Sequence, residues 1–297
     1  MVSRRSLIAA GAGAAFASIG RAHARDSKQG GGMADALDDL AALEAERGGR
    51  LGVSVLDAGT RRRLDFRADE RFPMCSTHKF LTVAAILEKV DRGEFGLDRK
   101  VPFTGADLLS YAPIARKNIA VGTMTVDALA AATISWSDNT ADNLLLASIG
   151  GPAGWTRYAR SLGDGISRLD RIEPELNTAI PGDPRDTTSP AAMVRNLDVV
   201  LLGKALADTS RLRLESWMFD SPITGNLLRA GLPEGWRVAD KSGSGENGTR
   251  NDIGMITRPG AAPLLAAIYC TQAPGDLAAR DRMLADVGRI VARTFAP

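Results

Sequence analysis

The two ends of this chain carry its strand-like segments, and this separation is the feature that most constrains the fold. Residues 50–57 and 61–67 alternate polar and apolar side chains around Ala58-Gly59-Thr60, a pattern typical of an antiparallel hairpin. Further strand patterns lie near the C-terminus, at residues 236–242, 252–257 and 263–270. Because a strand buries its apolar face only within a sheet, the pattern predicts an antiparallel sheet whose first and last parts meet in space.

Between these strands the 297-residue chain is mostly helical, and no strand pattern interrupts it from about residue 76 to residue 232. Leu, Ile, Val and Ala recur there at helical spacing. The helices expected in this region span residues 76–90, 126–133, 140–149, 152–162 and 190–206. Two more, at 33–47 and 276–295, flank the strand segments. We therefore expect a helical lobe inserted beside the sheet.

One segment of the middle region, residues 163–190, is rich in proline and is expected to form a long ordered loop. Loops of this length in a folded domain are often functional. Ile172, Leu176 and Ile180 are expected to pack inward and hold the loop in place.

Cysteine and histidine are scarce, which excludes several kinds of site. Cys75 and Cys270 are too few for a disulfide scaffold or a four-thiolate zinc site. The two histidines, His23 and His78, argue against a zinc hydrolase and against a Ser-His-Asp hydrolase. Hydrolytic chemistry in this chain is therefore expected to run without histidine.

The N-terminal residues 1–24 are typical of a twin-arginine export signal. They contain Arg4-Arg5, an apolar stretch and a cleavage pattern at Ala22-His23-Ala24. A membrane anchor is the alternative, but the stretch is shorter than the ~20 residues that span a bilayer. Cleavage lowers the net charge from +2 to −1, leaving 34 basic and 35 acidic residues. We expect a periplasmic monomer with a flexible segment at 25–32, no nucleic-acid partner and no stable membrane association.

A serine with a lysine base occurs at Ser76-Thr77-His78-Lys79. At the start of a helix, Ser76 and Lys79 share one face, so the ammonium lies one turn from the hydroxyl. A lysine can accept a serine proton when its environment lowers its proton affinity, and the helix N-terminus favours a developing oxyanion. The alternative is an N-cap serine followed by a solvated lysine, because one such pattern is expected by chance in a chain of this length.

Two further polar triplets are candidates for the same site. Ser137-Asp138-Asn139 precedes an expected helix, where it could relay a proton and bind an amide, or simply cap the helix. Lys241-Ser242-Gly243 ends an expected strand, where the lysine could hold a carboxylate and the glycine could let a ligand approach the backbone. The glycines of 243–248 match a dinucleotide-binding pattern, but a strand follows them, so we interpret them as a hairpin.

The three motifs, at 76–79, 137–139 and 241–243 and in this order, resemble those of the penicillin-recognising serine enzymes. The loop segment Glu173-Pro174-Glu175-Leu176-Asn177 resembles the Ω-loop of class A β-lactamases. Arg171 and Asp186 stand where that family has a loop-closing ion pair. The likeness extends over the mature chain. We call residues 168–186 the Ω-loop.

The resemblance implies an α+β fold of three layers, α/β/α. A five-stranded antiparallel sheet is flanked by helices and carries an inserted all-helical lobe. The catalytic domain spans 33–297, with a sheet lobe at about 33–72 and 233–297 and a helical lobe at about 73–232. The active site lies between the two lobes, and no metal or organic cofactor is implied.

The resemblance also implies a reaction, the hydrolysis of penicillins and cephalosporins through a serine acyl-enzyme, with antibiotic resistance as its consequence. Ser76 attacks the β-lactam carbonyl, and Lys79, or Glu173 through a water, takes the serine proton. Ser137 passes a proton to the lactam nitrogen. Glu173 and Asn177 position the water that frees the enzyme. The β-lactam is the one small-molecule partner expected.

The remaining residues implied by the resemblance bind the substrate. The backbone amides of Ser76 and Ser244 form the oxyanion hole. Asn139 meets the side-chain amide of the antibiotic, and Tyr111 lines the mouth of the site. The residues implied to meet the substrate carboxylate are Lys241, Ser242 and Arg250, with Gly243 beside them.

Some residues depart from the family pattern. His78 inside the first motif and Ile172 in the Ω-loop are expected to alter packing more than chemistry. Cys75 lies where one carbapenem-hydrolysing subgroup has a disulfide, but Gly245 stands at the partner position, so we expect a free thiol. A penicillin-binding D,D-peptidase is the main alternative, although it would lack the Glu173 to Asn177 loop. A β-lactam sensor is the other, although it would need a membrane segment.

Overall fold

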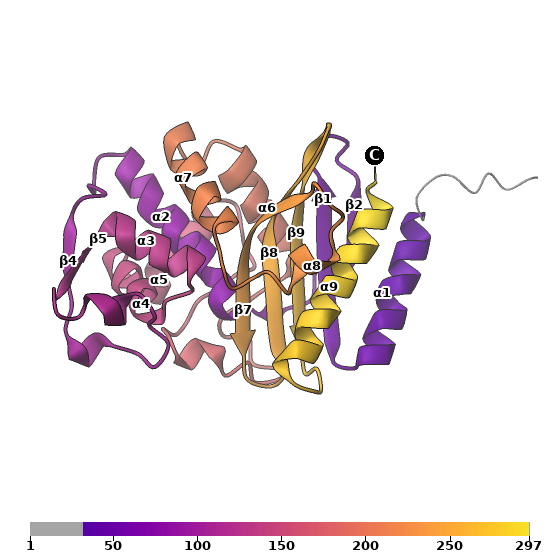
Figure 1. The fold of residues 1–297 in the computed structure, drawn as a ribbon, viewed down its shortest axis with the longest axis horizontal. Helices are drawn as coiled ribbons and strands as arrows, with labels where there is room; N and C mark the ends of the chain where they lie inside the picture. Colours follow the sequence, from indigo (N-terminus) through magenta and orange to yellow (C-terminus); the bar gives the residue numbers. More distant parts are fainter. Residues whose placement is uncertain (1–31, 297) are drawn as a thin grey trace, which may run out of the picture.

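The computed structural model describes residues 32–296, and its largest element is a five-stranded sheet (Figure 1). The sheet has the order β2-β1-β9-β8-β7, and every neighbouring pair is antiparallel. Its strands are β1 (Arg50–Asp57), β2 (Arg63–Phe66), β7 (Arg237–Gly245), β8 (Thr249–Arg258) and β9 (Ala261–Thr271). Leu51 of β1 lies opposite Cys270 of β9, so the prediction that the two ends of the chain meet in one sheet is confirmed.

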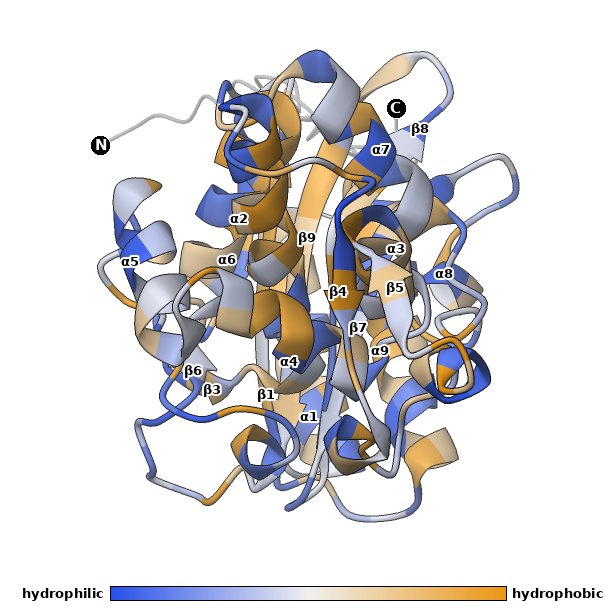
Figure 2. Ribbon diagram, turned by 90° about the vertical axis from the view of Figure 1, so that its left-hand side faces the viewer, coloured by the Kyte–Doolittle hydropathy of each residue, from blue (hydrophilic) through white to orange (hydrophobic). Residues whose placement is uncertain are grey.

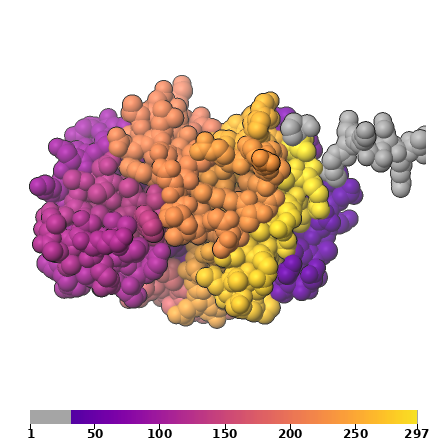
Figure 3. Space-filling model, viewed as in Figure 1, coloured from indigo at the N-terminus to yellow at the C-terminus, as the bar shows by residue number. Residues whose placement is uncertain are grey.

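One face of the sheet is covered by the helices nearest the two ends of the described chain. These are α1 (Met33–Arg47) and α9 (Leu277–Thr294), which lie side by side in Figures 1 and 3. Leu40 of α1 and Val287 of α9 pack in one cluster with Ile268 of the sheet. The residues of β9 alternate between the two faces, as a strand buried on both sides requires.

The opposite face of the sheet packs against helices from the middle of the chain. Residues drawn as hydrophobic gather on α2, α4 and β9 in the interior (Figure 2). Met193 of α6 and Phe80 of α2 share one apolar cluster with Tyr269 of β9. These helices are α2 (Lys79–Asp91), α3 (Val126–Ser135), α4 (Asn139–Ser148), α5 (Gly151–Ser161), α6 (Pro190–Leu197) and α7 (Asp208–Phe219), whereas α8 (Leu228–Gly231) packs with α9 on the first face. The α+β architecture with a sheet between helical layers is confirmed.

The middle of the chain also contains strands, contrary to the sequence expectation. They form two small ladders, β3 (Phe72–Pro73) with β6 (Thr187–Thr188) and β4 (Lys100–Pro102) with β5 (Thr123–Thr125). Segments of two or three residues are too short to show an alternating pattern, so the sequence did not reveal them.

Two further expectations about this region are wrong in detail. The helix expected over 190–206 ends at Leu197 and continues as a π-helix, Asp198–Leu202. Of the three side chains expected to pack inward from the Ω-loop, Leu176 is buried, whereas Ile172 and Ile180 are 46% and 49% exposed. Leu169 and Ala179 are buried with Leu176, and hydrogen bonds and ion pairs hold the rest of the loop.

The predicted signal at 1–24 and most of the segment 25–32 lie outside the described residues. Within 32–296, no helix has both the length and the apolar character that a membrane crossing requires. Segments within the range expected for the helical lobe also pack on the sheet side, because α6 contacts β1 and β9 while α8 contacts α9. The outer limits of the lobes therefore stay a prediction.

Candidate active site

The proposed nucleophile lies in a short 3₁₀ helix, Cys75–His78, that leads directly into α2. Cys75 has φ of 46°, in the left-handed region that is unfavourable for a residue with a side chain. The side-chain amide of Asn251 on β8 donates to the carbonyls of Pro73 and Met74, at 2.9 and 3.0 Å. The turn is thus held by the sheet as well as by its own helix.

Lys79 confirms the expected one-turn relation to Ser76, since its Nζ lies 3.0 Å from Ser76 Oγ. The lysine is not solvated, because its side chain is fully buried. Its Nζ donates to Asn139 Oδ1 at 2.6 Å and to the carbonyl of Ser137 at 2.9 Å. It also forms an ion pair with Glu173 Oε1 at 2.8 Å. A lysine with these contacts can exchange a proton with either Ser76 or Glu173.

The second motif both caps a helix and builds the site. Asp138 is the N-cap of α4 and accepts from the backbone N–H of Ala141 at 2.9 Å. Ser137, with φ of 58°, and Asn139, the first residue of α4, face Lys79 instead. The capping interpretation is confirmed for Asp138, whereas Ser137 and Asn139 are the residues placed to take part in the site.

Lys241 of β7 approaches the site from the sheet. Its Nζ donates to Ser137 Oγ at 3.0 Å and to the carbonyl of Ser242 at 2.8 Å. Burial lowers the pKa of Lys241 to about 7, and the nearby charge of Lys79 acts in the same direction. Ser137 Oγ thus lies between two lysine ammonium groups, which suits a hydroxyl that relays protons.

Glu173 of the Ω-loop lies on the other side of Ser76. Its carboxylate is almost fully buried, and its Oε1 accepts from Ser76 Oγ at 3.2 Å. Its Oε2 accepts from the side-chain amide of Asn177. Oδ1 of Asn177 is buried and has no hydrogen-bond partner among residues 32–296. A water molecule between these two groups can donate one hydrogen bond to the Glu173 carboxylate and one to Asn177 Oδ1.

The Ω-loop is anchored at both ends of its catalytic segment. Asn143 of α4 donates to the carbonyl of Glu173 at 2.9 Å and accepts from its N–H at 3.1 Å. The expected ion pair is present, since Arg171 Nε lies 2.6 Å from Asp186 Oδ2. The backbone N–H of Glu246 donates to the carbonyl of Asn177 at 2.8 Å. Sequence reasoning missed Asn143, although its position four residues after Asn139 on one helix was a signal for it.

These residues surround a cavity of about 250 Å³. The side chains and backbone that line it are Ser76, Tyr111, Ser137, Asn139, Asn177, Ile223, Ser242, Gly243, Ser244 and Arg250. Of the other expected site residues, Lys79, Glu173 and Lys241 are buried next to it. Ile223 is the lining residue that the sequence did not suggest. A single apolar residue belongs to no sequence motif that could have indicated its place in the site.

Gly243 has a second structural reason besides the expected one. A Cβ on Gly243 would lie 2.8 Å from the carbonyl oxygen of Met74 and 3.2 Å from Thr77. The glycine therefore allows β7 to pack against the nucleophile turn, in addition to lining the cavity. A Cβ on Gly245 would lie 2.6 Å from Cys75 Sγ and 2.7 Å from the carbonyl oxygen of Asn177, and both cysteines are free and buried.

Two residues at the rim have contacts of their own. Arg250 Nε donates to Asp281 of α9 at 2.7 Å, which fixes the guanidinium beside the cavity. The hydroxyl of Tyr111 donates to the carbonyl of Trp136 at 3.1 Å, and its ring is exposed. The hairpin expected around 243–248 is present, because β7 and β8 pair from Gly245 and Thr249 outward.

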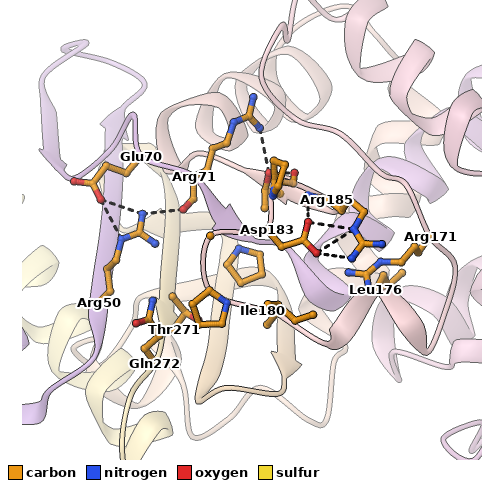
Figure 4. Close-up of a pocket in the computed structure, with 16 residues that line it drawn as sticks. Arg50, Glu70, Arg71, Arg171, Leu176, Ile180, Asp183, Arg185, Thr271 and Gln272 are labelled. Carbon is orange, nitrogen blue, oxygen red and sulfur yellow. Dashed lines mark hydrogen bonds and ion pairs between the residues drawn. The ribbon is translucent and has the colours of Figure 1, made fainter.

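A larger cavity, of about 430 Å³, lies between the outer part of the Ω-loop and the edge of the sheet. Four of its charged groups form two ion pairs, Arg50 with Glu70 and Arg185 with Asp183 (Figure 4). It has no nucleophile paired with a base. The smaller cavity is therefore the candidate active site, because polar groups of several elements converge there.

One group in the described residues has donor atoms close enough to hold a metal ion. The nearest atoms of His78, Asp142 and Glu173 lie within 4.8 Å of one another. Both ring nitrogens of His78 are already hydrogen-bonded, however, one to Asp142 and one to the carbonyl of Cys75. We interpret the group as a buried ion-pair cluster, which sequence reasoning missed because its members are 64 and 31 residues apart.

Comparison with known proteins agrees with this geometry. The model of the β-lactamase enzyme family matches residues 34–295. The β-lactamase CTX-M-97 of Escherichia coli is 47% identical over 256 residues, which are 86% of this chain and 88% of the relative. A β-lactamase of Streptomyces albus G is 44% identical and covers 99% of this chain and 97% of its own. A solved ancestral class A β-lactamase superposes with a TM-score of 0.86 at 51% identity, over 88% of this chain and 100% of that one.

Proposed function

The chain belongs to the class A β-lactamase family, and on that premise we propose a role for each residue of its active site. It is a serine β-lactamase that hydrolyses the β-lactam amide bond and so confers resistance. The single observation that carries the proposed roles is the position of Lys79 Nζ, within hydrogen-bonding reach of both Ser76 Oγ and Glu173 Oε1. The comparisons do not favour a D,D-peptidase or a sensor.

Acylation begins when Ser76 Oγ attacks the lactam carbonyl. Lys79 at 3.0 Å and Glu173 at 3.2 Å are both within reach of the serine proton, so either can act as the base. The oxygen of the tetrahedral intermediate is stabilised by the backbone amides of Ser76 and Ser244. Breaking of the C–N bond then requires a proton on the lactam nitrogen, which Ser137 supplies from its position between Lys79 and Lys241.

Deacylation uses the Ω-loop side of the cavity. Glu173 takes a proton from water, and the hydroxide attacks the ester carbonyl of the acyl-enzyme. The C–O bond to Ser76 then breaks as Oγ takes back a proton from Glu173, which frees the enzyme. Asn177 donates its amide N–H to Glu173, while its Oδ1 is an acceptor with no other partner in residues 32–296. The asparagine thereby orients both the base and the water.

Substrate binding is assigned to the opposite wall and the rim. The substrate carboxylate is held by Lys241, Ser242 and Arg250, whose guanidinium is fixed by Asp281. Gly243 and Ser244 contribute the β7 backbone. The remaining contacts come from Asn139, to the side-chain amide of penicillins and cephalosporins, and from Tyr111 at the mouth.

We also propose export of the folded protein by the twin-arginine route, followed by function as a periplasmic monomer. Support comes from Arg4-Arg5 and the cleavage pattern Ala22-His23-Ala24. Changing both arginines to lysine should leave an uncleaved precursor in the cytoplasm, detected by fractionation and immunoblotting. Normal periplasmic accumulation of this variant would refute the route, although not the export.

The proposed roles are tested with purified protein and nitrocefin. Wild-type protein should hydrolyse nitrocefin, and Ser76→Ala should not. Mass spectrometry after mixing with a slowly hydrolysed β-lactam should find the adduct on the Ser76 peptide. An adduct on another residue, or hydrolysis by Ser76→Ala, would contradict the assignment.

A further inference from the structure

A second buried pair, His78 and Asp142, lies directly behind the nucleophile. His78 belongs to the same short helix as Ser76 and precedes Lys79, and its side chain is fully buried. Its Nδ1 lies 2.7 Å from the carbonyl oxygen of Cys75, and its Nε2 lies 2.8 Å from Asp142 Oδ2. A carbonyl oxygen can only accept, so Nδ1 carries a hydrogen. If Nε2 also donates to Asp142, the ring is an imidazolium.

The charges around the ring favour this form. Burial by itself would lower the pKa of His78, but the charge and hydrogen bond of Asp142 outweigh burial and raise it. Burial likewise opposes ionisation of Asp142, but the charge of His78 holds its carboxyl pKa below the usual value. The other charged groups that face the ring are Glu173 of the Ω-loop and Lys79 of α2, which neutralise each other as an ion pair. The uncharged Cys75 thiol lies next to them.

The pair connects the nucleophile turn to α4. On the turn, the imidazole holds the carbonyl of Cys75, the residue whose left-handed backbone directly precedes Ser76. On α4, Asp142 lies between Asn139, which contacts Lys79, and Asn143, which holds the backbone of Glu173. His78 Nε2 lies 2.8 Å from Asp142 Oδ2, and the hydroxyl of Thr82 on α2 also acts on the same carboxylate. Loss of either partner would therefore release the turn from the helix that aligns its base.

We propose that His78 and Asp142 are positioning residues that act as one buried imidazolium–carboxylate unit and hold Ser76 and Lys79 in place for acylation. The proposal rests on the β-lactamase mechanism above. It assigns neither residue to the proton transfers themselves. The alternative with the same hydrogen bonds is a neutral pair, with the shared proton on Asp142.

Nitrogen NMR of the wild-type site separates these two forms without reference to activity. The full chain has two histidines, so His23→Gln leaves His78 as its one imidazole. In this protein, labelled with ¹⁵N-histidine, both ring nitrogens should give protonated signals that do not change between pH 5 and pH 8. One unprotonated ring nitrogen anywhere in that range would overturn the charged unit. This measurement stays decisive even if substitutions at the pair prevent folding.

Kinetics of Asp142→Asn and His78→Gln test the positioning role. Asparagine keeps an oxygen acceptor but removes the charge. Each variant should slow single-turnover acylation by nitrocefin about 10- to 100-fold, as expected for a misplaced reactive group. The double variant should be no slower than the slower single variant, because both remove one unit. The Asp142→Asn profile of kcat/KM should also gain an ionisation below the ordinary histidine pKa of about 6.5, absent from wild type and from His78→Gln, because burial of the ring is then no longer opposed by the Asp142 charge.

Asp164→Asn is the matched control, because it also neutralises a buried carboxylate, one that accepts from Ile166, Ser167 and Asn196 away from the cavity. It should lose stability while it keeps the wild-type acylation rate and pH profile. Folded His78→Gln and Asp142→Asn that acylate at the wild-type rate would overturn the positioning role. An inactive wild type would instead refute the proposed function, and the NMR result would still decide whether the pair is charged.

Discussion

Glu173→Gln should convert this hydrolase into a protein that acylates and then stops. The carboxylate is 1% exposed, and its two oxygens contact Lys79, Ser76 and Asn177. Glutamine has the same size and retains one oxygen acceptor, but it cannot take a proton from water. The substitution therefore removes the base of deacylation with little change of shape.

The size of the effect on each step follows from the bases in the site, because deacylation depends on Glu173 whereas acylation can also use Lys79. Loss of a general base costs about 10²–10⁴-fold, or about 2.7–5.4 kcal/mol in the barrier to deacylation. Acylation should fall less, because Lys79 Nζ remains 3.0 Å from Ser76 Oγ and keeps Ser137 and Asn139 as neighbours. For a typical turnover of about 10 s⁻¹, the variant would release its adduct at about 10⁻¹–10⁻³ s⁻¹. Acyl-enzyme should then persist for roughly ten seconds to many minutes.

Stopped-flow mixing with nitrocefin measures this directly. The variant should give a burst of about one equivalent, followed by a slow steady rate, with the adduct found on Ser76 by mass spectrometry of quenched samples. Removal of one partner of a buried ion pair can cost about 3–5 kcal/mol of stability, so urea unfolding must show that the variant is folded in the assay.

Asp186→Asn is the control for a merely structural role of Glu173. It breaks the ion pair with Arg171 that closes the Ω-loop but leaves Glu173 and Asn177 unchanged. It should lose about 1–3 kcal/mol in the free energy of unfolding and keep balanced turnover without a burst. Wild-type hydrolysis by Glu173→Gln with no accumulated acyl-enzyme would refute the reasoning, as would an equal burst in both variants.

Three further predictions follow from the same contacts. The kcat/KM for benzylpenicillin should fall as the pH rises through about 7, because Lys241 then loses the charge that holds the substrate carboxylate. Lys241→Arg should remove this fall from the pH–rate profile. A fall that persists in the variant would point to another group. Cys75 and Cys270 should resist a thiol reagent at pH 8 in the native protein, because burial raises the pKa of both thiols, that of Cys270 to about 12. Both should react after denaturation without reductant. A single reactive equivalent, or none, would reveal oxidation. Gly245→Ala should lower the free energy of unfolding by about 1–3 kcal/mol and slow deacylation, because the alanine Cβ would collide with Cys75 Sγ and the carbonyl of Asn177. Unchanged urea midpoints and deacylation rates would show that this contact is loose.

Local patterns in the sequence were sufficient for the long elements. The helix at 33–47 and the strand at 50–57 have the expected bounds, since each repeats its apolar spacing over several turns or pleats. α7 (Asp208–Phe219) was missed, because its buried residues Ser210, Leu214 and Met218 form only one narrow stripe that begins with a serine. Strands of two or three residues were missed because they are too short to repeat an alternating pattern.

The sequence by itself determined which groups could do chemistry. Scarce histidine excluded two classes of hydrolase, and the order of the Ser76, Ser137 and Lys241 motifs indicated the family that the comparisons confirm. A helical spacing of three residues was enough to bring Ser76 and Lys79 together, because both lie on one turn.

Only the tertiary structure decided how these groups are paired. Lys79 meets Glu173 across 94 residues and His78 meets Asp142 across 64, and nothing in the local pattern specifies either distance. The pairs form because α4 and the Ω-loop pack against the nucleophile turn and exclude water from four ionisable side chains. Burial makes each charge depend on its partner, so the properties of Lys79, Glu173, His78 and Asp142 belong to the packed cluster and not to any segment of the chain.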